Sequence, residues 1–316
     1  MTATVHQLLN SLVTTAAPKN LEDEAAKARA RNVKRFGWLC VLWPRIQVVS
    51  SVASFSESEG RVAFGKNVSG YDSSRPDYLD WVFDKLVEQG SLAQDAATLE
   101  IGSGNGLATT KLVQSGVSPL TLIEPDERFA SLLTPLMGDK DTLLTETFED
   151  ATLAFASFDL VFIATAYHWL DPATRISKLA QVTKCDGFVA LLWNVFQNLS
   201  LEDPFHEATK GLLSNLSHSP SGKPDTMPFA LDREAREREF SESDLFRVLS
   251  YYESHWSLSL KPKEVRSLFE GFSQIARLPS VKREGLLDEF EAIATQQFSG
   301  LVERNMTTVL YVFQRI

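Results

Sequence analysis

One short segment limits the possible folds of this chain more than any other. The stretch from Leu99 to Gly106 reads LEIGSGNG, and an apolar helical pattern begins at Leu107. Glycine adopts positive φ angles without a steric penalty and lets the backbone come close to a ligand. The segment therefore predicts a buried strand, a tight glycine turn and a helix, with a ligand bound at the turn.

Short apolar runs alternate with helical patterns along the chain after this point. The runs that predict buried strands are Thr98–Ile101, Leu120–Glu124, Phe158–Ala164 and Gly187–Trp193, with a weaker one at Thr142–Thr145. The segments that predict helices are Asp77–Gln89, Leu107–Ser115, Glu127–Leu136 and Pro172–Val182. Alternating strands and helices favour an α/β fold, in which helices cover both faces of a largely parallel sheet.

The C-terminal part of the chain completes this sheet. Strand-like alternation at Phe246–Leu260 and Thr307–Gln314 encloses helical patterns at Pro262–Leu268 and Ser280–Gln297. We therefore expect a Rossmann-like sheet of seven strands. Residues 1–69 are expected to form an N-terminal extension or cap, and residues 70–316 the main domain. A polar and then charged stretch at about 195–242 predicts an insertion or lid.

Composition and charge exclude several classes of protein. The formal net charge of −10 lacks the basic surplus of a nucleic-acid-binding protein. Two cysteines, Cys40 and Cys185, are too few for a disulfide framework, and neither lies in a metal-ligand cluster. The apolar stretch Phe36–Val52 contains Pro44 and Arg45 and is too short to span a bilayer. We expect a cytoplasmic protein without a metal and without stable membrane insertion; the sequence indicates no oligomeric state.

A second anchor for a ligand is Glu124, at the end of the next apolar strand after the glycine turn. An acid at this position can accept hydrogen bonds from both hydroxyls of a ribose, as in dinucleotide-binding folds. The glycines here are spaced Gly-x-Gly-x-Gly, whereas nicotinamide enzymes have Gly-x-Gly-x-x-Gly. An acid, Glu100, also stands two residues before the first glycine, where it suits an ammonium group better than a pyrophosphate.

This acidic glycine segment resembles that of the class I S-adenosylmethionine-dependent methyltransferases. The resemblance implies that the glycine loop holds the methionine part of S-adenosylmethionine and that Glu124 holds its ribose, with S-adenosylhomocysteine as the product. It also implies that Phe148 and Glu149 lie beside the adenine, although Thr147 stands where many relatives have an acid. The residues expected to bind the cofactor are Tyr71, Arg75, Glu100, Gly102, Ser103, Gly104, Gly106, Glu124, Pro125, Phe148 and Glu149.

Three further segments resemble the trans-aconitate methyltransferase-like branch, also described as methyltransferase type 11/25-like. They are Tyr71–Tyr78 (YDSSRPDY), Tyr167–Pro172 (YHWLDP), and the region of Phe272-Ser273, Leu278-Pro279 and Arg283. The resemblance implies an acceptor site made by Tyr167, His168, Trp169 and Trp193. His168 is a candidate general base, or equally a residue that orients the acceptor. Tyr71 is a candidate to lie over the sulfonium group.

The sequence therefore predicts transfer of a methyl group to a small organic acceptor. Methylation of a carboxylate oxygen is narrowly preferred, because of the branch resemblance. Two alternatives stay open. One is an NAD(P)-dependent oxidoreductase on the same architecture, which the glycine spacing and Glu100 disfavour. The other is a non-catalytic regulatory protein that binds the cofactor as a structural feature.

Overall fold

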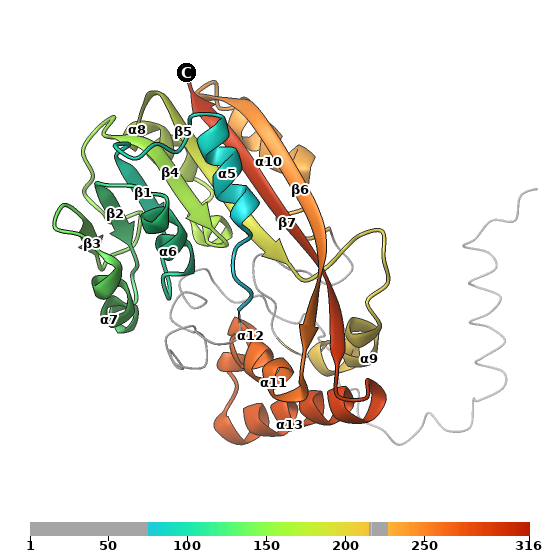
Figure 1. The fold of residues 1–316 in the computed structure, drawn as a ribbon. Coiled ribbons are helices and arrows are strands. Elements are labelled where there is room, and N and C mark those ends of the chain that lie inside the picture. The colour runs from blue at the N-terminus through green and yellow to red at the C-terminus, as the bar shows by residue number, and fades with distance from the viewer. Residues whose placement is uncertain (1–74, 215, 217–226) are drawn as a thin grey trace, which may run out of the picture. The chain divides into compact units, whose positions relative to one another are not determined.

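A computed structural model describes residues 75–214, 216 and 227–316 of the chain. Their central feature is a seven-stranded sheet in the order β3-β2-β1-β4-β5-β7-β6 (Figure 1). The strands are β1 Thr98–Ile101, β2 Leu120–Ile123, β3 Thr142–Leu144, β4 Phe158–Ala164, β5 Thr183–Val195, β6 Phe246–Leu260 and β7 Val302–Arg315. The first five strands run parallel to one another, and β7 runs antiparallel to both β5 and β6. The predicted Rossmann-like, mostly parallel sheet is confirmed.

Nine α-helices accompany the sheet in the described part of the chain. They are α5 Asp80–Glu88, α6 Leu107–Gln114, α7 Ala130–Leu133, α8 Arg175–Val182, α9 Pro204–Leu213, α10 Arg233–Ser241, α11 Pro262–Glu270, α12 Ser273–Ala276 and α13 Ser280–Gln297. The segment expected as one helix at Glu127–Leu136 is instead three short pieces, with α7 between two 3-10 turns. Pro135 lies in the last of these turns, where its missing N–H and fixed φ do not favour a continuous helix.

The sheet has a separate apolar core on each face, because successive side chains of a strand point to opposite sides. On one face, Val161 and Ile163 of β4 pack in a cluster that includes Leu179 of α8 and Phe240 of α10. On the other face, the alternate β4 residues pack with side chains of α5 and α6. Helices thus cover both faces, as the sequence predicted.

Strands β6 and β7 extend past the ends of the other strands in the sheet. The register of β6 and β7 continues from Phe246↔Arg315 to Leu260↔Val302, and β7 begins five residues before the predicted Thr307. Figure 1 shows this hairpin extending beyond the other strands toward α11, α12 and α13. A third apolar cluster forms there, where Leu260 and Val302 pack with side chains of α9, α11 and α13. Burial at this end explains why a segment as polar as Val302–Met306 still forms a strand.

The insertion expected at about 195–242 contains two helices that belong to different cores. Phe205 of α9 packs in the cluster at the end of the hairpin. Phe240 of α10 is fully buried and stacks on Phe313 of β7, with ring centroids 3.7 Å apart. In the charged run Asp232–Glu239, the Asp232 side chain accepts a hydrogen bond from the backbone of Ala235 and caps α10. The end of the insertion is therefore part of the helical layer on the sheet. The predicted extension, residues 1–69, lies outside the described residues.

Replacing Phe240 by Ala is expected to lower the free energy of unfolding by about 3–5 kcal/mol, because the variant leaves a cavity against the sheet. Urea denaturation measures this loss. Phe155→Ala is the matched control, since Phe155 is 73% exposed and its truncation is expected to change stability by less than about 0.5 kcal/mol. Equal and small effects for both variants would mean that α10 is not held in the core.

Candidate functional site

A cavity of about 460 Å³ opens at the carboxyl ends of β1, β2, β4 and β5, where ligands bind in open α/β sheets. Eleven of the residues predicted to bind cofactor or acceptor line it: Arg75, Glu100, Gly102, Ser103, Gly104, Glu124, Pro125, Phe148, Glu149, His168 and Trp169. They come from five separate segments of the chain. The fold therefore brings most of the candidate residues into one place.

The glycine turn after β1 is held in a conformation that few other residues could adopt. Gly102, Gly104 and Gly106 all have positive φ angles. A Cβ atom on Gly102 would lie 2.5 Å from the Ala166 Cβ, so the loop after β4 leaves no space for a side chain. A Cβ on Gly104 would meet nothing within 4 Å, because this glycine faces open space on the cavity wall. Gly106 does not line the cavity; it begins α6 and packs against Leu136.

Glu124 ties the glycine turn to the end of β2. One of its carboxylate oxygens accepts a hydrogen bond of 2.8 Å from the Gly104 backbone N–H, and the other accepts one of 3.0 Å from the Asp126 N–H. Glu124 is only 7% exposed, and its burial raises the pKa of the carboxyl group despite these two bonds. The carboxylate thus sets the position of the loop as well as facing the cavity.

Glu100 lies deeper, under the same turn. Its carboxyl group accepts a hydrogen bond of 2.7 Å from the Thr109 hydroxyl on α6. The pKa of Glu100 is raised to about 8, chiefly by burial, with the Thr109 bond opposing the shift and the nearby Glu124 charge adding to it. Without a cation beside it, Glu100 is therefore mostly protonated at neutral pH. A ligand with an ammonium group would stabilise its charged form.

The segment that follows β3, which includes Phe148 and Glu149, forms a second wall of the cavity. Phe148 is 2% exposed, and Glu149 accepts a hydrogen bond of 2.8 Å from the backbone N–H of Asp171. The Lys178 ammonium group of α8 donates to the backbone carbonyl groups of Glu149 and Ala151. Thr147, which departs from the family pattern, uses its hydroxyl to bond Asp150. These contacts fix the loop against α8.

Three consecutive residues after β4, Tyr167, His168 and Trp169, form a 3-10 turn and face different environments. His168 and Trp169 line the cavity, whereas Tyr167 is fully buried and donates a hydrogen bond of 2.6 Å to Glu239. A 3-10 helix has three residues per turn, so neighbouring side chains point about 120° apart. The expectation that Tyr167 contacts the acceptor is therefore corrected: it packs in the core behind the site.

Trp193 is also behind the cavity wall and not part of it. It is 3% exposed, and its indole N–H lies 3.5 Å from Nδ1 of His168. Its ring packs edge-on against Tyr167 and Tyr311. Trp193 thus supports His168 from the core, which corrects its predicted contact with the acceptor. Tyr71, the remaining candidate, lies outside the described residues.

His168 lies in a positively charged environment. Burial and, to a smaller extent, the charges of Arg75, Arg175 and Arg236 together lower its pKa to about 3. The ring is therefore neutral at physiological pH. An indole N–H can only donate, so Nδ1 accepts from Trp193 and the ring proton is on Nε2. His168 consequently offers a hydrogen-bond donor at Nε2.

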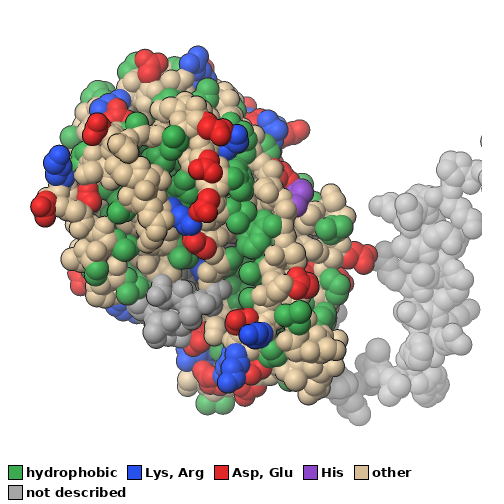
Figure 2. All heavy atoms as spheres, in the orientation of Figure 1, with side chains coloured by type: hydrophobic (Ala, Val, Ile, Leu, Met, Phe, Trp, Pro, Cys, Tyr) green, Lys and Arg blue, Asp and Glu red, His purple; other side chains and the backbone are tan. Residues whose placement is uncertain are grey.

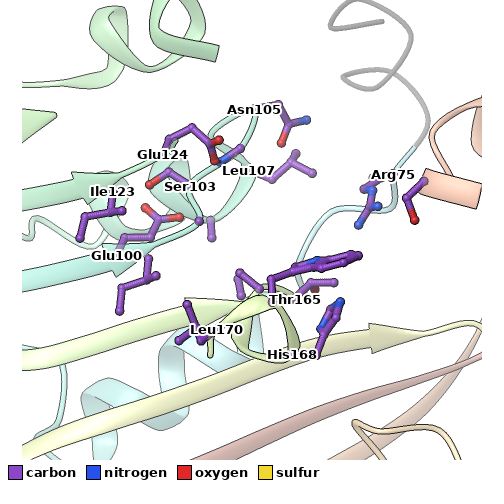
Figure 3. A pocket seen from close by; sticks show the side chains of 18 of the residues that line it. Arg75, Glu100, Ser103, Asn105, Leu107, Ile123, Glu124, Thr165, His168 and Leu170 are labelled. Carbon is purple, nitrogen blue, oxygen red and sulfur yellow. The ribbon is translucent and has the colours of Figure 1, made fainter. Parts of the chain in front are cut away.

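The cavity has two ends of opposite chemical character. Figure 3 shows Glu100 and Glu124 with the glycine loop on one side, and Arg75 and His168 on the other. Sequence reasoning missed several residues that line the cavity, including Gln197 after β5 and Gln274 on α12. No local motif marks either residue.

In the described ranges, no group of three or more His, Cys, Asp and Glu residues could hold a metal ion. No helix in the same part of the chain is long and apolar enough to cross a membrane. On the face drawn in Figure 2, acidic and basic side chains are interspersed.

Comparisons with known proteins agree with this geometry. Residues 99–191 match a family described as "methyltransferase domain". An uncharacterized methyltransferase of Mycobacterium tuberculosis is 30% identical, over 44% of this chain and 55% of the relative, so the chain spans about half the length of that relative. An uncharacterized methyltransferase of Schizosaccharomyces pombe is 23% identical, over 80% of this chain and 97% of the relative.

The solved structure of the [4+2]-cyclase SpnF has the same fold, with a TM-score of 0.50 and 12% identity over 83% of this chain and 96% of that one. A likeness at this identity shows the fold alone. The match of residues 99–191 is to a methyltransferase domain, and the glycine turn and the acid after β2 both lie within these residues.

The high pKa of Glu100 predicts a measurable dependence of stability on pH. The ordinary pKa of this carboxyl group is 4.5, and its pKa in the folded protein is about 8. Between these two pH values, the folded state keeps a proton that the unfolded state has lost. Its contribution to stability therefore falls as the pH rises through this window and is constant above it. Urea denaturation from pH 5 to 9 should show a flatter profile for Glu100→Gln than for the wild type, with the variant relatively more stable at pH 8. Parallel profiles would contradict the assigned pKa.

Proposed function

We propose that this protein transfers a methyl group from S-adenosylmethionine to a small organic acceptor, and that S-adenosylhomocysteine is the second product. One observation carries the proposal. The glycine turn and Glu124 lie together at one end of a single cavity, and a second set of polar residues lines its other end. This arrangement suits a donor and an acceptor held side by side.

The residues present fit the cofactor. Gly104 leaves open a space that any side chain would enter, so its backbone can lie directly against a ligand. The Ser103 hydroxyl is buried and has no hydrogen-bond partner among the described residues, and a polar ligand would satisfy it. Buried Glu100 suits the ammonium group of the methionine part, since a nearby cation lowers the cost of its charge.

When bound, S-adenosylmethionine supplies a methyl group already activated by a positively charged sulfur. The protein then needs chiefly to align the acceptor and to exclude water. We assign Gly102, Ser103 and Gly104 to the amino-acid part of the cofactor, and Glu124 with Pro125 to the ribose. We assign Phe148 and Glu149 to the adenine, with Thr147 in place of the usual acid. Trp169 would form the wall between the two ends of the cavity.

We propose that His168 orients the acceptor and is not its general base. A general base must accept a proton, and an imidazole ring with a pKa of about 3 accepts one poorly at neutral pH. In the neutral ring, Nε2 already carries the proton. The Nε2–H group can instead donate a hydrogen bond to an acceptor oxygen. This role fits a carboxylate acceptor, because a carboxylic acid is already ionised at neutral pH and needs no base.

These arguments favour O-methylation of a carboxylate, as the branch resemblance implied. Neither alternative gains support from the cavity. A nicotinamide cofactor would bring its pyrophosphate against the glycine turn, where Glu100 and Glu124 are buried acids. A non-catalytic protein would not need polar residues at the acceptor end.

Replacing Glu124 by Ala is expected to weaken binding of S-adenosylhomocysteine about tenfold to a hundredfold, because charge-assisted hydrogen bonds to the ribose and to the glycine loop are lost. Isothermal titration calorimetry on the folded variant measures the change. Glu127→Ala is the control, since Glu127 is exposed and does not line the cavity. Unchanged affinity in Glu124→Ala, or tighter binding of NAD than of S-adenosylhomocysteine to the wild type, would overturn the assignment.

The role of His168 predicts different results for two substitutions. His168→Ala should raise the KM for the acceptor while changing kcat little, and His168→Gln should restore part of the affinity because its amide N–H lies near the position of Nε2–H. Mass spectrometry of the product after mild hydroxide treatment identifies the methylated atom. A base-labile methyl ester is expected. A loss confined to kcat would mean that His168 is the base, and a hydroxide-resistant product would exclude the carboxylate acceptor.

A further inference from the structure

A residue at the end of β4 has a backbone conformation that its side chain does not favour. Thr165 has a φ angle of 55°, in the left-handed region that glycine adopts freely. For a β-branched residue, this conformation is an outlier that costs free energy. Five non-glycine residues in the described part of the chain have positive φ, and among them Thr165 alone is β-branched and alone lines the cavity. The strain therefore lies at the functional site.

Contacts on both sides of Thr165 hold its backbone in this conformation. Its N–H donates a hydrogen bond of 2.7 Å to the carbonyl group of Leu192 on β5. The next residue, Ala166, packs against Gly102 so closely that a Cβ on this glycine would lie 2.5 Å from the Ala166 Cβ. The chain must turn sharply between these two contacts. A strained conformation persists where the surrounding structure fixes it, and Thr165 meets this condition.

The Thr165 side chain has a partner from a distant part of the chain. Glycine would adopt the same conformation without strain, so a threonine at this position indicates a role for its hydroxyl group. The Thr165 Oγ1 atom lies 3.0 Å from the hydroxyl oxygen of Tyr78, within hydrogen-bond distance. Both residues line the cavity, and Figure 3 shows Thr165 on the wall that also contains His168. The pair thus joins the segment before α5 to the end of β4.

Tyr78 lies beside the helix that follows the glycine turn. Its ring packs against the apolar cluster that contains Ala108 of α6. The Lys111 ammonium group, also on α6, pairs with Asp80 at 2.7 Å and with Asp77 at 3.2 Å. Because α6 begins directly after the glycine turn, Tyr78 belongs to the part of the cavity that we assign to the amino-acid end of the cofactor.

We propose that the Tyr78 hydroxyl group binds the carboxylate of the cofactor, and that Thr165 is the positioning residue that fixes this hydroxyl group. The inference rests on the proposed methyl transfer, which places the amino-acid part of the cofactor at the glycine turn. A tyrosine hydroxyl group can donate one hydrogen bond and accept another. Tyr78 would donate to the carboxylate and accept from Thr165. Thr165 itself does not touch the carboxylate; it acts through Tyr78.

Calorimetric titration of the full chain with S-adenosylhomocysteine tests both roles. Tyr78→Phe should weaken binding about tenfold, because it removes the bond to the carboxylate. Thr165→Val keeps the β-branched shape without the hydroxyl group and should weaken binding about threefold. The double variant should bind like Tyr78→Phe alone, because Thr165 has nothing to orient once the tyrosine hydroxyl group is absent. Thr165→Ser, which keeps a hydroxyl group, should bind like the wild type.

Two further measurements separate these roles from a general loss of structure. Methylthioadenosine lacks the amino-acid part of the cofactor, so Tyr78→Phe should bind it as well as the wild type does. Urea denaturation tests the strain. Thr165→Gly should be more stable than Thr165→Ala, because glycine adopts a positive φ without a steric penalty.

Tyr251→Phe and Thr209→Val are the matched controls. Each removes a hydroxyl group that donates a hydrogen bond, to Glu253 and to the Phe205 carbonyl group respectively, and neither residue lines the cavity. Both variants should bind S-adenosylhomocysteine like the wild type.

If Thr165→Val does not fold, Thr165→Ala replaces it in the comparison. Losses of affinity that multiply in the double variant would show that Thr165 does not act through Tyr78. Wild-type affinity in Tyr78→Phe, or an equal loss of affinity for methylthioadenosine, would overturn the contact with the carboxylate. A less stable Thr165→Gly than Thr165→Ala would contradict the strained backbone. Failure of the wild type to bind S-adenosylhomocysteine would instead overturn the proposed function.

Discussion

The close approach of the loops after β1 and β4 is the constraint on which the site depends. The Cα atom of Gly102 lies so near Ala166 that an added Cβ would be 2.5 Å from the Ala166 Cβ. This contact sets the spacing between the glycine turn and the residues that follow β4, among them Thr165, His168 and Trp169. The glycines of the turn have positive φ angles, and the Gly104 N–H donates a hydrogen bond to Glu124. A side chain at Gly102 would therefore disturb the place where the loops after β1 and β4 meet.

Charge separates the two ends of this cavity. At the end formed by β1 and β2, Glu100 and Glu124 are buried with few compensating bonds, so their pKa values are raised and a cation is favoured nearby. At the other end, burial and then the charges of Arg75, Arg175 and Arg236 lower the pKa of His168. The two ends of the cavity therefore differ in the charge of the groups around them.

Local patterns predicted much of the fold and the cofactor end of the site. Strand boundaries such as Thr98–Ile101 and Phe158–Ala164, and helix α13 at Ser280–Gln297, agree with the structure because each depends on burial of a continuous apolar run or stripe. The length of β7 was underestimated, because Glu303, Arg304 and Asn305 are polar. Arg304 is held in the strand by Asp203 of the α9 cap, a partner that no local pattern reveals.

The sequence by itself determined the strand, turn and helix around Gly102–Gly106 and the acid at the end of the next strand, since these features need only neighbouring residues and the steric freedom of glycine. Tertiary structure alone decided which side chains face the cavity. His168 and Trp169 face it, whereas Tyr167 and Trp193 pack behind it, because a 3-10 turn and the pleat of β5 point adjacent residues to different sides. Contacts such as Asn194 with Asp77, and Arg175 with Glu239, join residues far apart in the sequence. Their formation depends on strand register and helix packing, which only the folded chain supplies.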